Sequence, residues 1–348
     1  MDSHPEEAPF HAQLMDVESL LAQLARPHAL RSTTTRVTTR AGEVLVEERD
    51  AEGVVTTTRV GSTSLASLSL RFGFSWHGHS ERWVEQQQER DDDGCLDEAG
   101  ACRRLLRIVT YNVWFAERDQ LARAEVAMGE LECLDADLIC LQEVTQPFLD
   151  LLLEQDFVRE QYVVTDGRGS SIVPYGVVML VKAEVGLQSL EFIPLPSNMG
   201  RRALAVKTVA PAAFVVTAHL ESKNSPEYRA AQAAAIAAYL ADEGSCAAIH
   251  VFAGDTNVMA RSEENAALCS ALAPLVDTYD AAGATFSSTI HPPEPPRRID
   301  RIFVSPEHAG AVVSLELVGA AAELGLTASD HLGLVLDLEV VNGGPSRS

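Results

Sequence analysis

The sequence predicts a fold that combines α-helices with β-strands, and three observations support this. From Leu105 onward, short apolar runs typical of buried strands alternate with helical segments. Several of the strand runs end directly at a polar residue. From Ile302 onward, strand runs follow one another without a helical pattern, which indicates a closing antiparallel segment. The pattern leaves two arrangements open: packed sheets of mostly antiparallel strands, and a parallel, doubly wound sheet.

Length and composition allow one large domain with a smaller one, or two domains. The chain has 348 residues, of which 46% are hydrophobic and 22% are charged, so most of it can bury an ordinary core. The formal net charge is −23. Such acidity argues against a protein that holds nucleic acid through a broad basic surface. It is compatible with an enzyme that binds a short nucleic-acid end with the help of a divalent cation, or with a charge that serves solubility alone.

Cysteine usage and the N-terminal sequence point to an intracellular protein. None of the six cysteines forms a CxxC pair, which argues against a structural zinc site. Residues 1–9 are acidic and lack the apolar core of a signal peptide, and no apolar run is long enough to span a membrane. We therefore expect a reducing setting, either nucleus or cytoplasm, and no membrane contact.

Residues 1–103 differ from the rest and carry no recognisable chemistry. Val17–Ala25 has a short helical pattern. Two threonine-rich runs, Thr33–Val37 and Thr56–Val60, flank a turn-like segment and predict a small β-hairpin or meander, or else a solvated threonine-rich stretch. Glu81–Gly100 is acidic and is interpreted as a linker. We expect an accessory segment, partly disordered, whose partner the sequence does not indicate.

The remainder, 104–340, is predicted to be a single domain, followed by a disordered tail at 341–348. The expected helices are Leu121–Leu134, Pro147–Leu153, Ser225–Leu240 and Ser262–Leu272. The expected strands are Leu105–Tyr111, Asp137–Leu141, Tyr175–Val181, Arg202–Thr208, Ala212–Thr217, Ala247–Ala253, Ile302–Val304, Val312–Leu317 and Leu332–Leu338.

The segment after Ala253 is the most informative. Gly254 ends the strand, and Asp255 and Asn257 then stand two residues apart, so in an extended chain both side chains project to the same face. Taken alone, Gly-Asp-x-Asn is also an ordinary turn sequence. The interpretation therefore depends on the ends of the other strands.

Polar residues recur at those ends, namely Asn112, Glu143, His219, Asp255, Asn257, Asp300, Asp330 and His331. Each has a simpler explanation: Glu143 as a surface acid, His219 as a core histidine, Asp300 as a partner of a nearby arginine. Together these carboxylates, amides and histidines suit a hard cation and a phosphate. A Gly-x-Ser-x-Gly elbow, a P-loop and a His-Glu-x-x-His motif are all missing from the sequence.

Six segments resemble, in order, the motifs of the endonuclease/exonuclease/phosphatase superfamily. They are Thr110–Asn112, Leu141–Glu143, His219–Ser222, Gly254–Asn257, Arg298–Ile302 and Ser329–His331. The resemblance covers about residues 105–340, and within the superfamily it is most similar to the tyrosyl-DNA phosphodiesterase 2 family; Arg229 and Gln232 also fit the spacing of that family. It implies a deoxyribonuclease I-like α+β fold, a four-layer α/β/β/α sandwich of two mixed, mostly antiparallel sheets.

The resemblance also implies an activity. We expect a phosphodiesterase that uses Mg²⁺, with Mn²⁺ as an alternative, and hydrolyses the 5′-phosphotyrosyl bond between a DNA end and a trapped topoisomerase. A tyrosine phenol has a pKa near 10, so it leaves with little acid assistance. Alternatives of the same fold are a nuclease, a sphingomyelinase-like enzyme and an inositol phosphatase-like enzyme, and a non-catalytic binding module is the alternative from another class.

The matching positions imply a role for each residue. Glu143 and Asn112 are expected to hold the metal, and Asn112 also to orient the phosphate. Asp255 is expected to be the general base, and Asn257 and His219 to bind the phosphate. His331 is expected to be a cationic donor beside Asp330, and Asp300 to orient a histidine, for which we expect His219. Ser222 and Lys223 are expected to touch the substrate strand. One departure is Trp114, which stands where the family often has a metal-supporting aspartate.

Overall fold

A computed structural model describes the backbone of residues 34–40, 43–49, 55–60, 72–77, 82–87, 102–242, 249–292, 294–320 and 326–342. The chain divides into two compact units, Met1–Leu68 and Ser69–Ser348. The predicted helix at Val17–Ala25 lies outside the described residues.

The first unit contains a three-stranded antiparallel sheet. Its strands are β1 (Thr34–Arg40), β2 (Glu43–Arg49) and β3 (Val55–Val60), in the order β1-β2-β3. This arrangement is a meander, one of the alternatives that the sequence left open. Its threonine and valine residues are β-branched, which suits the pleated backbone of a strand.

The second unit contains an eight-stranded mixed sheet, in the order β16-β17-β6-β7-β9-β8-β4-β5. The strands are β4 (Phe72–His77), β5 (Arg82–Gln87), β6 (Cys102–Asn112), β7 (Leu138–Val144), β8 (Tyr162–Val164), β9 (Gly176–Lys182), β16 (Val312–Val318) and β17 (Gly333–Asn342). Only β6 and β7 pair in parallel, while the chain's last strand, β17, lies antiparallel to β6.

A six-stranded sheet forms the other half of this unit, in the order β10-β11-β12-β13-β15-β14. Its strands are β10 (Leu187–Pro194), β11 (Arg202–Thr208), β12 (Ala213–His219), β13 (Ile249–Asp255), β14 (Val276–Asp277) and β15 (Asp300–Val304). The pair β12–β13 is parallel, and the other pairs are antiparallel. The alternative of a parallel, doubly wound sheet is therefore wrong.

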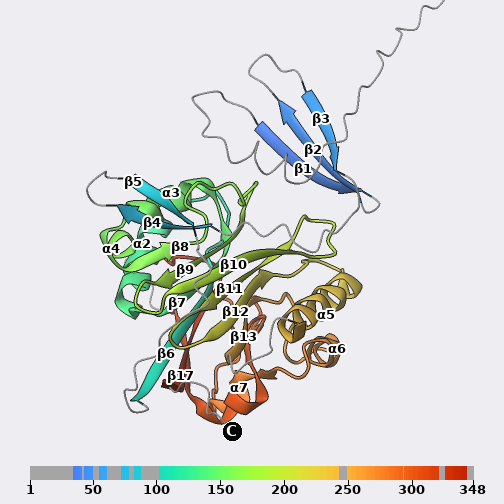
Figure 1. Cartoon of the computed structure of the whole chain (residues 1–348). Helices are drawn as coiled ribbons and strands as arrows, with labels where there is room; N and C mark the ends of the chain where they lie inside the picture. The colour runs from blue at the N-terminus through green and yellow to red at the C-terminus, as the bar shows by residue number, and fades with distance from the viewer. Residues whose placement is uncertain are drawn as a thin grey trace, which may run out of the picture. The chain divides into compact units, whose positions relative to one another are not determined.

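Three apolar clusters define four layers. In β7, Leu138 and Cys140 point between the sheets, whereas Ile139 and Leu141 point outward, because alternate residues of a strand face opposite sides. The outer face packs against α2 (Gln120–Leu134), α3 (Gln146–Glu154) and α4 (Asp156–Gln161). The six-stranded sheet packs outward on α5 (Pro226–Asp242) and α6 (Glu264–Ala271), as Figure 1 shows. The predicted α/β/β/α sandwich is confirmed. Two short elements, α7 (Thr278–Ala281) and η2 (Pro306–Ala311), complete the unit.

A buried polar bridge joins the two sheets next to the site. The Gln142 side-chain amide nitrogen donates to Thr110 Oγ1 and to Thr217 Oγ1, both at 3.0 Å. All three side chains are fully buried. Because a buried amide must find partners, this contact fixes how β7 and β12 lie across the interior.

Two boundaries differ from those we predicted. Residues 82–87 of the expected linker form β5, which pairs with β4 at the edge of the eight-stranded sheet, so the compact unit begins before residue 104. In the sequence, the tryptophans and valine of these strands have polar neighbours, so the alternation of apolar and polar residues typical of a strand is weak. At the other end β17 continues through Asn342, and residues 343–348 lie outside the described part.

Within the described part of the chain, no helix has the length and apolar character needed to cross a membrane.

Candidate active site

The polar strand ends gather at one edge of the sandwich. Asn112 ends β6, Asp255 ends β13 and His219 ends β12, while Asp300 begins the antiparallel β15. In the six-stranded sheet Asp255 is the register partner of both His219 and Asp300. Because an antiparallel strand starts at the edge where its neighbours end, the topology brings these groups together.

Close backbone packing supports this edge. A Cβ atom added to Gly254 would lie 2.1 Å from the Ala218 carbonyl oxygen, so a side chain cannot be accommodated at this position. Glycine therefore allows β13 to approach β12 directly before Asp255.

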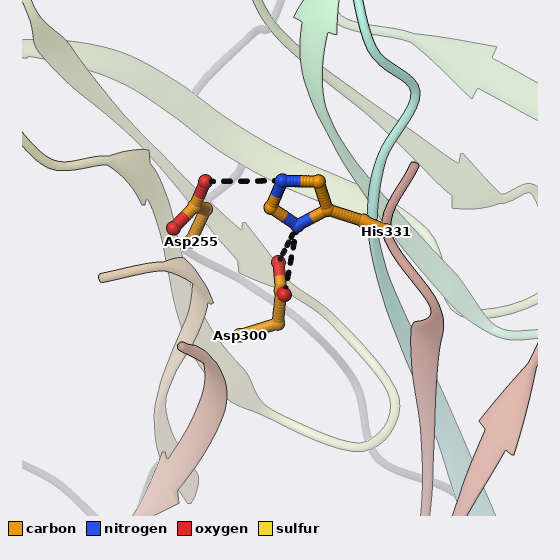
Figure 2. A group of neighbouring side chains, drawn as sticks. All are labelled: Asp255, Asp300 and His331. Carbon is orange, nitrogen blue, oxygen red and sulfur yellow. Dashed lines mark hydrogen bonds and ion pairs between the residues drawn. The ribbon is translucent and has the colours of Figure 1, made fainter. Parts of the chain in front are cut away.

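His331 lies between two aspartates, as Figure 2 shows. Its Nδ1 donates to Asp300 Oδ2 at 2.9 Å, and its Nε2 is 3.9 Å from Asp255 Oδ2. Burial lowers the pKa of His331, but the charge and hydrogen bond of Asp300 outweigh it and, with further carboxylates, raise the pKa to about 10. His331 is therefore a cation at neutral pH. The expectation that Asp300 orients His219 is wrong, because its partner is His331.

Asp255 has an almost fully buried side chain, and burial raises the pKa of a carboxyl group. Desolvation and the neighbouring Asp300 charge raise the pKa of Asp255 to about 7, against the lowering effects of His331 and two hydrogen bonds. A carboxyl group with a pKa near neutrality can take up and release a proton at working pH, which suits a general base.

Asn112 joins the two carboxylates of the site. Its amide nitrogen donates to Asp255 Oδ2 at 3.0 Å and to Glu143 Oε1 at 3.2 Å, while its amide oxygen accepts from the Trp114 backbone N–H. Asn112 thus presents its NH₂ group to the two carboxylates and its oxygen to the Trp114 backbone. In this geometry it bridges the two acids.

Glu143 offers a carboxylate that could hold a metal. It has a positive φ of 59°, a buried carboxylate, and a hydrogen bond from the Phe115 backbone N–H to Oε2 at 2.9 Å. Burial raises the pKa of Glu143. A divalent cation would favour the ionised form of both Glu143 and Asp255, so these oxygen donors fit a hard cation. Ligand atoms of Asp255, Asp300 and His331 also lie within 4.8 Å of one another, but His331 and Asp300 are already hydrogen-bonded.

His219 faces the same Asp255 oxygen from the other side, with Nε2 at 3.3 Å. The Arg201 guanidinium lies against it, with nitrogens 3.0 and 3.3 Å from the two ring nitrogens. Burial, followed by the Arg201 charge, lowers the pKa of His219 well below its usual value. His219 is therefore neutral, and Arg201 supplies the positive charge on this side.

Sequence reasoning missed Arg201 and the aromatic group beside it. Arg201 is 8% exposed and its Nε has no hydrogen-bond partner. Its guanidinium lies 5.3 Å from the Tyr175 ring, which stacks on Phe115 at 4.6 Å. No motif indicates that these residues belong to the site. The sequence shows only a pair of arginines, Arg201 and Arg202, where β11 begins.

The remaining predicted residues lie at the rim. Asn257 is half-buried, with a positive φ of 52° and its amide nitrogen donating to the Leu220 carbonyl at 3.1 Å. Ser222 and the exposed Lys223 lie on the loop after His219. Asp330 is half-buried; it adds to the field that raises the pKa of His331, but Asp300 makes the hydrogen bond.

The sequence model of the endonuclease/exonuclease/phosphatase family matches residues 109–331, more than half of the chain. The chain belongs to this family. The match runs from β6 to His331 and so includes every buried residue of the site.

Individual relatives agree with this placement. Tyrosyl-DNA phosphodiesterase 2 of Xenopus tropicalis is 28% identical over 253 residues, covering 67% of this chain, and the human protein of that name is 26% identical over 257 residues, covering 68%. The chain spans 66% of the length of the X. tropicalis protein and 69% of the human one.

Solved structures show the same fold. A humanised Danio rerio TDP2 aligns with 69% of this chain and 99% of its own, with a TM-score of 0.59 and 22% identity. D. rerio TDP2 in complex with a single-strand DNA product aligns with 67% of this chain and 98% of its own, with a TM-score of 0.57 and 23% identity.

Proposed function

We propose that this chain is an Mg²⁺-dependent phosphodiesterase that hydrolyses the 5′-phosphotyrosyl bond between a DNA end and a trapped topoisomerase. The observation that carries the proposal is the arrangement of Asp255 next to His331, which Asp300 holds as a cation. The substrate class is supported by the similarity to tyrosyl-DNA phosphodiesterase 2. We place the activity inside the cell, where such DNA ends arise.

The reaction requires attack by water on phosphorus opposite the phenolic oxygen. Asp255 takes a proton from the water, the water oxygen bonds to phosphorus, and the phosphorus–phenol bond breaks with its electron pair going to the phenolate. A phenolate is stable enough to leave without a general acid, since its conjugate acid has a pKa near 10.

Charge on the phosphoryl group needs fixed positive partners. His331 supplies one from the eight-stranded sheet, and Arg201, with its unpartnered Nε, supplies one from the other sheet. We assign Glu143 as the residue that holds the metal, and Asn112 and Asn257 as amides that orient the carboxylates and the phosphate. A Mg²⁺ ion held by Glu143 would supply further positive charge to the phosphoryl group.

The test is a substrate panel with purified protein, with Mg²⁺, with Mn²⁺ and with EDTA. The panel contains a 5′-phosphotyrosyl oligonucleotide, an abasic duplex, a single-stranded oligonucleotide, inositol phosphates and sphingomyelin. We expect metal-dependent release of tyrosine, loss with EDTA and recovery with Mg²⁺. The Asp255→Asn variant, purified identically, shows whether the activity belongs to this protein. Turnover of a lipid, an inositol phosphate or an internal DNA bond without tyrosine release would overturn the proposed substrate.

A further inference from the structure

The loop that carries Arg201 is folded around one hydroxyl group. Between β10 and β11, the Ser197 Oγ accepts the backbone N–H of Met199 at 3.0 Å and that of Arg201 at 2.9 Å. The same hydroxyl donates its proton to Glu221 Oε2 at 2.5 Å. The backbone position of Arg201 is therefore linked to Glu221 through a single side chain.

Glu221 is a buried anchor for that loop. Its side chain is 1% exposed, and it also accepts the Asn198 backbone N–H at 2.9 Å and the Gln232 amide at 3.2 Å. Gln232 in turn donates to the Pro196 carbonyl at 2.8 Å and accepts the Glu221 backbone N–H at 2.7 Å. Three consecutive loop residues, 196–198, are thus held by two side chains.

This arrangement matters because Arg201 lacks the usual means of orientation. Buried arginines are normally aimed by a carboxylate that accepts two of their donors. None of the ion pairs found among the described residues involves Arg201, whose guanidinium instead contacts His219, Tyr175 and, at 4.0 Å, the Met199 sulfur. Its direction therefore comes from its backbone, from ring packing and from a residue of its own loop.

A buried carboxylate such as Glu221 is costly unless its acceptors are filled, and an apolar side chain would stabilise the fold at least as well. Its hydrogen bonds converge on the loop before Arg201 and on the helix behind it. We propose that Glu221, acting through Ser197, is a positioning residue that holds the Arg201 guanidinium beside His219, where its charge serves the phosphoryl group. This inference rests on the proposed function, in which Arg201 carries positive charge beside His219.

The kinetic test measures kcat and KM with a 5′-tyrosyl oligonucleotide. Ser197→Ala and Glu221→Gln should lower kcat by about tenfold or more with little change in KM, because the displaced Arg201 charge no longer stabilises the transition state. Ser197→Thr, which keeps the hydroxyl, should retain most of the rate.

The matched control is Tyr228→Phe. Tyr228 donates to Asn198 Oδ1 at 3.0 Å, so this variant removes a hydrogen bond to the same loop without touching Ser197 or Glu221. Its rates should equal those of the unmodified protein. The double variant Ser197→Ala/Glu221→Gln should lose no more than the worse single variant, because both act through one contact. An unchanged kcat in Ser197→Ala and Glu221→Gln, or the same loss in Tyr228→Phe, would overturn the proposal.

A second measurement does not depend on turnover. In protein labelled with ¹⁵N-arginine, the Arg201 Nε–H signal, assigned with Arg201→Lys, should be shifted or broadened in Ser197→Ala and unchanged in Tyr228→Phe. If the signal changes while no tyrosyl ester is hydrolysed by any form, the positioning role stands and the proposed function fails. If the signal is the same in all variants, the positioning role is wrong whatever the substrate.

Discussion

His331 and His219 approach the same oxygen of Asp255 from opposite sheets, yet they differ in charge. His331 has a carboxylate behind its ring, and its pKa is raised to about 10. His219 has a guanidinium against its ring, and its pKa is lowered well below 6.5. The comparison shows that the partner of each histidine decides whether the ring or its neighbour carries the positive charge at the site.

The largest effect should come from the carboxylate that both histidines face. Asp255→Asn keeps the shape of the side chain but cannot accept a proton, so kcat should fall by about 10²- to 10⁴-fold while substrate affinity is largely kept. Single-turnover kinetics and a binding titration with the tyrosyl oligonucleotide measure the two quantities. A near-normal rate would remove Asp255 from the role of base.

A smaller but still large effect is expected when His331 loses the carboxylate that holds it as a cation. Asp300→Asn leaves His331 without its carboxylate partner, so its pKa should fall from about 10 and turnover at neutral pH should drop. NMR titration of the ring follows the pKa. Asp330→Asn is the matched comparison, and it should lower the pKa less, because Asp330 acts on His331 through its charge and makes no hydrogen bond to the ring.

The same substitution has a consequence for stability against pH. The pKa of His331 is higher in the folded than in the unfolded chain, so its ion pair stabilises the fold fully below about pH 6.5 and less as pH rises through about 10. Thermal unfolding should therefore show the unmodified protein losing stability over this window more steeply than Asp300→Asn. Parallel curves for the two proteins would contradict the charged state of His331.

Removing the Arg201 charge beside His219 should have a more moderate effect. Arg201→Gln takes away the charge that, after burial, lowers the pKa of His219, so this pKa should rise, though it should stay below 6.5 because the ring remains buried. The rate with the tyrosyl substrate should fall as well. An unchanged His219 titration would mean that burial alone keeps this ring neutral.

The smallest effect is expected far from either histidine. Deleting residues 1–68 removes a separate compact unit and should change neither rate nor melting temperature of the remainder. Deleting residues 1–103 also removes β4 and β5, so β8 keeps its partner β9 but loses β4 on its other side, and the melting temperature should drop. Equal melting temperatures for the two truncations would show that these strands contribute nothing.

The sequence predicted the sandwich and most of the candidate site because the same positions indicate both where a strand ends and where a polar side chain can act. An apolar run that stops at Asn112, His219 or Asp255 marks a strand and also its functional end. The weaker predictions concerned partners. Asp300 and His219 lie in the same sheet with β13 between them, about 10 Å apart at ordinary strand spacing, whereas His331 comes from the opposite sheet. Only the packing of the two sheets reveals that pairing.

Other elements were missed for local reasons. Arg201 lies in a loop with no periodic pattern, and its importance follows only from burial against His219. Strand β10 has an irregular burial pattern, and β4 and β5 are rich in polar residues, so neither shows clear alternation. The sequence could not show how Asn112 is used, because an amide offers an oxygen that can bind a cation and an NH₂ group that can donate to a carboxylate.

The pairing of β6 with β17 also decides when the two sides of the site can meet during synthesis. Asn112 and His331 belong to opposite ends of the second unit, and the partner of β6 extends to Asn342. At about 5–20 residues per second, a ribosome that has made β6 needs about 10–50 s to reach the end of β17. Until then β6 has no antiparallel neighbour on that side and His331 has not joined Asp255. A nascent chain that stops before His331 lacks both this residue and β17, so the proposed activity requires that β17 has been made.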